Sequence, residues 1–145
     1  MSLLDQAVET VNSWDENRIQ DRARTVLLFK QIAEQLDRAI AIWEEFLKQA
    51  PESGDRYTAV LWMGANVAKS LQAIYLENKA SAIALTELTG VRFKDSLSLA
   101  EDLDVVQPYD QMKPDETGSD RAKAAIRTMA ERKKSIETAI ASLGG

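Results

Sequence analysis

Two pairs of carboxylates have a spacing that could serve metal chemistry. Glu34 and Asp37 lie three residues apart, as do Glu101 and Asp104. At this spacing both acids of a pair project from one face of a helix. On facing helices, the four side chains could hold Mg²⁺ or another cation that prefers oxygen ligands. The pattern gives one functional hypothesis, a Mg²⁺-dependent hydrolase of phosphate esters such as nucleotides.

All-α nucleoside-triphosphate pyrophosphatases hold Mg²⁺ with such acids, and the chain resembles them only in being helical and acidic. Their Glu-Glu-x-x-Glu motif would need a third acid after Glu44-Glu45, where this chain has Lys48. The neighbouring Leu36 and Leu103 follow the apolar pattern, so Asp37 and Asp104 are expected to flank the core. Acid pairs with this spacing are also common on exposed helix surfaces.

The composition excludes several kinds of chemistry. The chain of 145 residues contains no histidine and no cysteine. A Ser-His-Asp triad, a His-ligated zinc site, a thiolate nucleophile and a disulfide framework are therefore impossible. A ferritin-like di-iron site is excluded too, because it needs Glu-x-x-His on two helices. We expect no cofactor, and the leading hypothesis is a non-enzymatic interaction or regulatory module.

The strongest charge contrast lies towards the end of the chain. Residues 101–120 hold seven acids and one lysine, whereas residues 121–134 hold six basic residues and one acid. The basic residues are Arg121, Lys123, Arg127, Arg132, Lys133 and Lys134. This basic strip could bind an anion or an acidic partner, or it could be a solvated helix attracted to the acidic loop before it. The strip lacks interleaved aromatic residues and the net charge is −5, which argues against nucleic acid.

A third candidate site is an apolar surface. Trp62 and Met63 lie off the apolar seam of their predicted helix, and Tyr57 is near them. An exposed aromatic patch of this kind marks an interface, so we predict a homodimer that forms through the second or third predicted helix, Trp14–Ala50 or Arg56–Thr89. Small residues around Gly64 allow close helix packing or, as another alternative, a pocket for a small ligand.

The elements that must position these residues are helices. Apolar residues recur at steps of three and four almost throughout, and no strand-like alternation is present. The pattern predicts helices over about Leu3–Val11, Trp14–Ala50, Arg56–Thr89, Phe93–Val106 and Asp120–Leu143, with a polar loop over Gln107–Gly118. The longest of them would exceed the diameter of a compact globule of this length, so an elongated bundle is expected.

Helix ends are marked by capping residues. Ser2 is placed to cap the first helix, Ser13 and Glu16 form a predicted capping box before the second, and Ser119 should cap the last. Gly90 is the expected left-handed residue after the third helix.

These patterns predict an all-α fold, an antiparallel four-helix bundle with long helices and one extra short N-terminal helix. A single domain over residues 1–145 fits the chain length. No apolar run reaches the length of a membrane span, and the first eleven residues contain Asp5 and Glu9 but no basic residue. We therefore expect a cytoplasmic protein that does not enter membranes.

Overall fold

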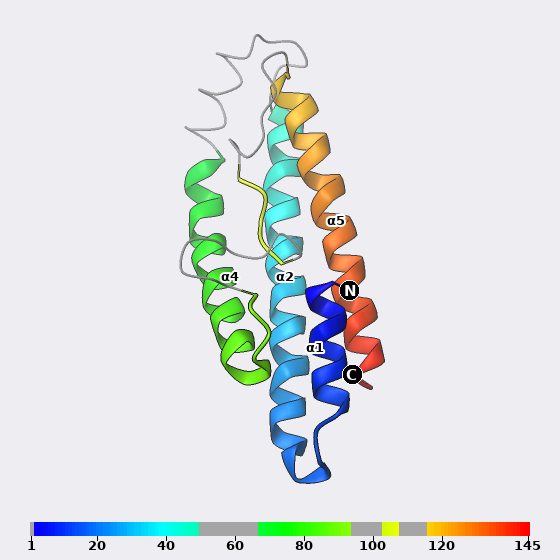
Figure 1. Ribbon diagram of the computed structural model, residues 1–145. Coiled ribbons are helices and arrows are strands. Elements are labelled where there is room, and N and C mark those ends of the chain that lie inside the picture. Colours follow the sequence, from blue (N-terminus) through cyan, green and yellow to red (C-terminus); the bar gives the residue numbers. More distant parts are fainter. Residues whose placement is uncertain (1, 50–66, 94–102, 108–115) are drawn as a thin grey trace.

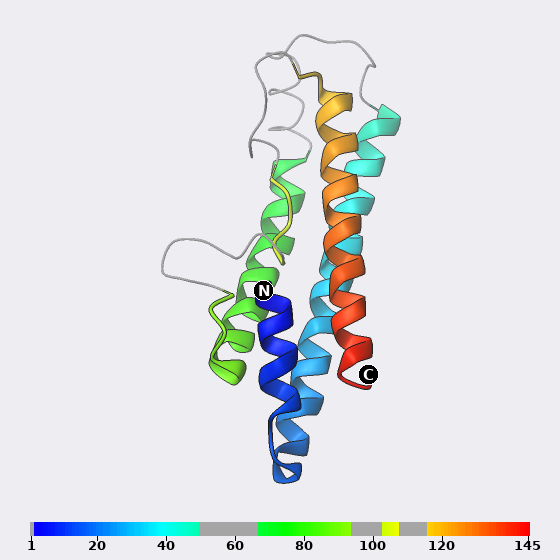
Figure 2. The same cartoon turned by 45° about the vertical axis from the view of Figure 1, so that its right-hand side comes forward.

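The fold is an all-α bundle, as the sequence predicts. A computed structural model describes residues 2–49, 67–93, 103–107 and 116–145 of the chain. It contains helices α1 (Leu3–Asn12), α2 (Ile19–Gln49), α4 (Ala68–Thr89) and α5 (Gly118–Ser142), and a 3-10 turn η1 (Glu16–Arg18) leads into α2. No strand occurs in these four stretches. The arrangement is elongated along α2 (Figures 1 and 2).

Helix α2 is the central element, and α4 and α5 pack along it. Both run antiparallel to α2 (Figure 1). Near its start, the Arg22 Nε–H donates to the carbonyl of Leu143 at the end of α5, at 3.2 Å. Further along, the Arg38 guanidinium contacts the Glu77 carboxylate of α4 at 2.6 Å. Helix α1 packs against both α5 and α4, and so completes the bundle at the end where α2 begins.

The core lies along the inner face of α2. Its large buried side chains recur at steps of three, four or seven residues, as expected for one face of a helix. They are Phe29, Ile32, Leu36, Trp43 and Phe46, and they meet Leu71, Leu85, Met129 and Ile136 from the flanking helices. Ile19, the first residue of α2, lies outside this core and is 70% exposed.

The predicted helix over Phe93–Val106 is wrong at its described residues. Residues 103–107 form a turn followed by extended chain, and Phe93 lies in a bend. The apolar positions are nevertheless buried as the pattern predicts: Phe93 packs edge to face against Phe29, with ring centroids 6.3 Å apart, and Leu103 and Val106 are inside. Residues 94–102 lie outside the described part.

The first helix boundary is confirmed, and the second is not. The Ser2 hydroxyl accepts from the Asp5 amide at 3.0 Å. Ser13, by contrast, ends α1 instead of capping α2, because its hydroxyl donates back to the Thr10 carbonyl at 2.6 Å. The predicted capping box is thus replaced by the 3-10 turn, and α2 begins at Ile19.

Of the two remaining predicted caps, Gly90 is confirmed, and Ser119 is replaced by Thr117. Gly90 adopts a φ of 77° and its amide donates to the Thr86 carbonyl at 2.8 Å, as expected for a left-handed cap. Helix α5 is capped by Thr117 and not by Ser119, which is buried in the first turn. The Thr117 hydroxyl accepts from the Asp120 amide at 3.1 Å, and the Asp120 carboxylate accepts from the Thr117 amide at 3.4 Å.

Across the described helices, none combines the length and the apolar character needed to cross a bilayer.

Candidate interaction surfaces

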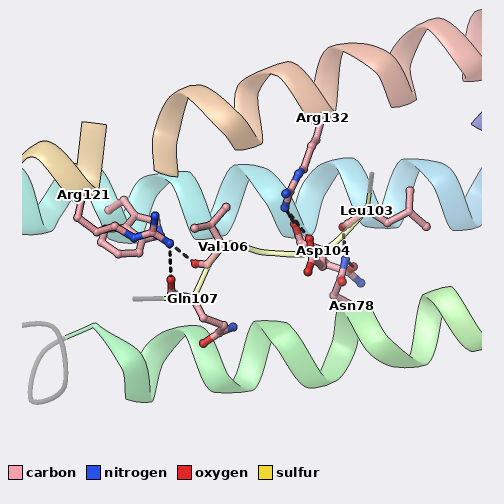
Figure 3. Close-up of polar contacts among 9 residues, drawn as sticks. Asn78, Leu103, Asp104, Val106, Gln107, Arg121 and Arg132 are labelled. Atoms are coloured by element: carbon pink, nitrogen blue, oxygen red, sulfur yellow. Dashed lines mark hydrogen bonds and ion pairs between the residues drawn. The ribbon is translucent and has the colours of Figure 1, made fainter. Parts of the chain in front are cut away.

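An extended segment, Leu103–Gln107, lies in the groove that α4 and α5 form over α2 (Figure 3). Three of its side chains, Leu103, Val105 and Val106, are buried. The segment thus closes the groove at one end of the bundle, as α1 does at the other end. The segment lies where the sequence predicts the end of the helix Phe93–Val106.

Side chains from all three long helices hold this segment by its backbone carbonyls. Asn78 of α4 donates to the Leu103 carbonyl at 2.9 Å. From α5, Arg132 donates to the Asp104 carbonyl at 2.7 Å and Arg121 to the Gln107 carbonyl at 2.8 Å. The Trp43 indole of α2 donates to the Val106 carbonyl at 3.3 Å. Extended backbone can be buried here because these donors satisfy carbonyls that a helix would satisfy internally.

Asn78 also belongs to a buried polar cluster between α2 and α4. Its side-chain amide donates to the side-chain oxygen Oε1 of Gln35 at 3.2 Å. The side-chain nitrogen Nε2 of Gln35 donates in turn to the Ser81 hydroxyl at 3.0 Å. All three residues are buried, and Asn78 is 0% exposed. Buried hydrogen bonds of this kind fix the register of the two helices, because a shift along the axis would leave each group unpaired. No pattern in the sequence predicted this cluster.

Two acids of the metal hypothesis are engaged by residues of the basic strip. Asp104 contacts Arg132 at 2.5 Å, with both side chains about one-fifth exposed. Asp37 contacts Lys133 at 2.8 Å, and Lys133 is also 3.5 Å from Glu137. Lys133 donates a hydrogen bond to the Asp37 carboxylate, and this bond, with the negative charges of Asp37 and Glu137, raises the pKa of Lys133 above its ordinary value.

Glu34 is exposed on α2, and Glu101 lies outside the described residues. Nowhere in the described part of the chain do three acids gather closely enough to hold a metal ion. The three described residues of the metal hypothesis, Glu34, Asp37 and Asp104, are therefore not brought together.

The basic strip divides into two groups on α5. Arg121 is buried beneath the extended segment, and Arg132 and Lys133 form the ion pairs with Asp104 and Asp37. Lys123, Arg127 and Lys134 are exposed. The first group attaches α5 to the rest of the bundle, whereas the side chains of the second group face solvent.

The predicted interface residues Tyr57, Trp62 and Met63 lie outside the described residues, as does Gly64. The described residues reveal a different apolar surface on α4, which corresponds to the third predicted helix. Ala73, Leu76, Ala80 and Ile83 are all exposed on α4, and Leu76 and Ile83 are 55% and 39% exposed. Their steps of three, four and three place them in one row, which we call the outer row.

The outer row faces away from the core. Residues of α4 that contact the core, such as Leu71, Asn78 and Leu85, occupy the opposite side of the helix. Helix α4 is therefore apolar on both faces, which is typical of a helix covered on both. The signal was present in the sequence as the a/d spacing of a coiled coil.

Among the described residues, shallow grooves lie beside α1 and the start of α2. One of about 530 Å³ lies between α1 and α5 and is rich in hydroxyl groups, including Ser2, Ser135 and Thr138. Another of about 490 Å³ lies beside Ile19 and Leu27, two further exposed apolar residues, and reaches Leu143 at the end of α5. The first groove is also lined by Asp5 and Glu9, and the second by Arg22 and Lys30.

Comparison of the chain with protein-family models, with curated proteins and with solved structures finds no match.

Proposed function

We propose that the protein is a non-enzymatic interaction module that self-associates, and that the outer row on α4 is the surface through which two copies meet. The observation that carries the proposal is a second apolar face on a helix whose first face is already buried. Leu76 is 55% exposed although it lies in the middle of α4, with Ala73, Ala80 and Ile83 in line with it. Apolar rows of this spacing are buried when two helices pair.

The placement of the charged candidates also supports a binding role over hydrolysis. The carboxylates of Asp37 and Asp104 point to cations of α5. Their negative charge thus contributes to attaching α5 to the rest of the bundle. A hydrolase would need both acids to turn towards a shared cation, at the cost of these ion pairs.

Sedimentation equilibrium of the wild type and of two matched variants tests the proposal. Leu76→Glu places a charge in the outer row, whereas Leu27→Glu places it on an equally exposed leucine of α2, 53% exposed against 55%. We expect a dimer for the wild type and for Leu27→Glu, and a monomer for Leu76→Glu, because burying an unpaired carboxylate opposes association. Circular dichroism spectra should match for all three, since both sites are exposed.

A wild-type protein that stays monomeric at about 200 μM, where even a dissociation constant of tens of micromolar would give mostly dimer, would overturn the proposal. A dimer that survives Leu76→Glu but dissociates in Leu27→Glu would instead assign the contact to α2.

A further inference from the structure

Two charged residues, one beyond each end of the outer row, indicate how a second copy would lie on it. Lys69 precedes the row by four residues and Glu87 follows it by four, so both continue the same line along α4. Both are exposed, and neither forms an ion pair with another described residue. The outer face of α4 is thus an apolar row with a positive end and a negative end.

We infer that two copies of the chain pair through antiparallel α4 helices, with Lys69 of each copy opposite Glu87 of the other. This inference rests on the proposed self-association and names its geometry. Pairing by a two-fold axis is the commonest way in which identical chains associate. For two helices side by side, an axis perpendicular to them gives an antiparallel pair, and an axis along them gives a parallel pair.

The antiparallel register follows from the positions in the row. If the two-fold axis crosses α4 at the level of residue 78, Leu76 of one copy lies opposite Ala80 of the other. Ala73 then lies opposite Ile83, and Lys69 opposite Glu87, because all three pairs have residue 78 as their midpoint. Each large side chain faces a small one, which lets the helices approach closely and fill the space between them.

A parallel pair does not have these advantages. Each residue of the row would then face its own copy, so Lys69 would meet Lys69 and Glu87 would meet Glu87. Like charges in contact oppose association, and the alanines would face each other across a gap that Leu76 and Ile83 hold open. The same charges that favour the antiparallel arrangement therefore disfavour the parallel one.

The contact area predicts a weak dimer. Helix α4 has 22 residues. A helix face about 33 Å long and about 10 Å wide covers about 330 Å². This is less than half of the ~800 Å² that each partner buries in a stable complex of standard size. We therefore expect a reversible association with a dissociation constant in the micromolar range.

Because the chain has no cysteine, introduced cysteines report the geometry directly. Lys69→Cys and Glu87→Cys are made as two separate proteins, mixed at a concentration at which the wild type is dimeric, and oxidised. Facing positions on helices about 8–10 Å apart have Cα atoms about 3–5 Å apart, and the upper part of this interval overlaps the range that a disulfide spans. We expect a disulfide-linked dimer in the mixture and almost none in either protein alone.

Charge reversal gives an independent readout. Lys69→Glu and Glu87→Lys should each weaken the dimer by about tenfold, since each replaces two attractive pairs with two repulsive ones. The variant that carries both substitutions restores opposite charges at both ends, and its dissociation constant should return towards that of the wild type.

The outcomes separate the geometry from the self-association. Cross-linking within each single-cysteine protein, but not between the two, would establish a parallel pair and overturn the inference. A dimer that shows no cross-linking and ignores the charge reversals would do the same, while the proposed self-association would stand. A wild-type chain without any dimer would overturn both.

Discussion

Replacing Asn78 with alanine removes the side chain that ties α4 both to α2 and to the extended segment. Two acceptors lose their donor, the Leu103 carbonyl at 2.9 Å and the Gln35 side-chain oxygen at 3.2 Å. Each buried acceptor left unpaired costs about 1–3 kcal/mol, and a small cavity adds to this. The loss is partly offset because the buried Asn78 Oδ1, which has no partner among the described residues, is removed as well. We expect the free energy of unfolding to fall by about 3 kcal/mol.

The assay is urea unfolding followed by the fluorescence of the three tryptophans. Gln72→Ala serves as the control, since this residue is exposed on the same helix and its loss should change stability by less than about 0.5 kcal/mol. If Asn78→Ala costs no more than the control, the hydrogen bonds to Gln35 and Leu103 do not stabilise the fold and the argument fails.

Asn78→Asp keeps the shape of the side chain and changes its hydrogen bonding. A carboxylate would face two acceptors in a buried site, so burial should raise its pKa in the folded state. A raised folded pKa means that the folded state binds the proton more tightly, so stability is greatest at low pH and falls as the pH rises. The variant should therefore be less stable than Asn78→Ala at pH 7 and recover towards pH 4. A cost that does not vary with pH would contradict the burial of this site.

Three further outcomes follow from the described contacts. Thr117→Ala removes the cap of α5 and should lower the free energy of unfolding by about 1 kcal/mol in the same urea assay. Lys133→Met should lower it by about 0.5 kcal/mol, and exposed Lys134→Met should not. Because the folded pKa of Lys133 is raised above 10.5, this contribution is complete below that pH and disappears as the pH rises through the folded value. Millimolar Mg²⁺ should leave the melting temperature unchanged, since Asp37 and Asp104 are held by cations; a rise would revive the metal hypothesis.

The sequence predicts the helices well because their information is local. The spacing of apolar residues and the caps at Ser2 and Gly90 depend on neighbours within one or two turns. Capping is harder to place where several small polar residues compete. Thr117 and Ser119 are both suitable, and the choice depends on which of them α5 buries against the rest of the bundle.

The extended segment shows where local information ends. Leu103 and Val106 fit a helical period, and they are buried as that period requires. The backbone is extended because its carbonyls are satisfied by Trp43, Asn78, Arg121 and Arg132, which lie 14 to 63 residues away in the chain. The residues of the segment themselves contain no pattern that predicts those donors. The same holds for the basic strip, because its composition does not show which of its cations form ion pairs or hydrogen bonds with other parts of the chain.

Because Leu76 and Asn78 lie on opposite faces of α4, their two roles can be measured separately, and stability then reports on association. A dimer is linked to folding by mass action, so the melting temperature of the wild type should rise with protein concentration. Leu76→Glu should abolish this dependence and leave the melting temperature at low concentration unchanged, because the side chain is 55% exposed in the single chain. Asn78→Ala should do the reverse and lower the melting temperature at every concentration while the dependence persists. If both variants lower it equally at high dilution, Leu76 stabilises the single chain, and the outer row is part of the fold instead of a contact between copies.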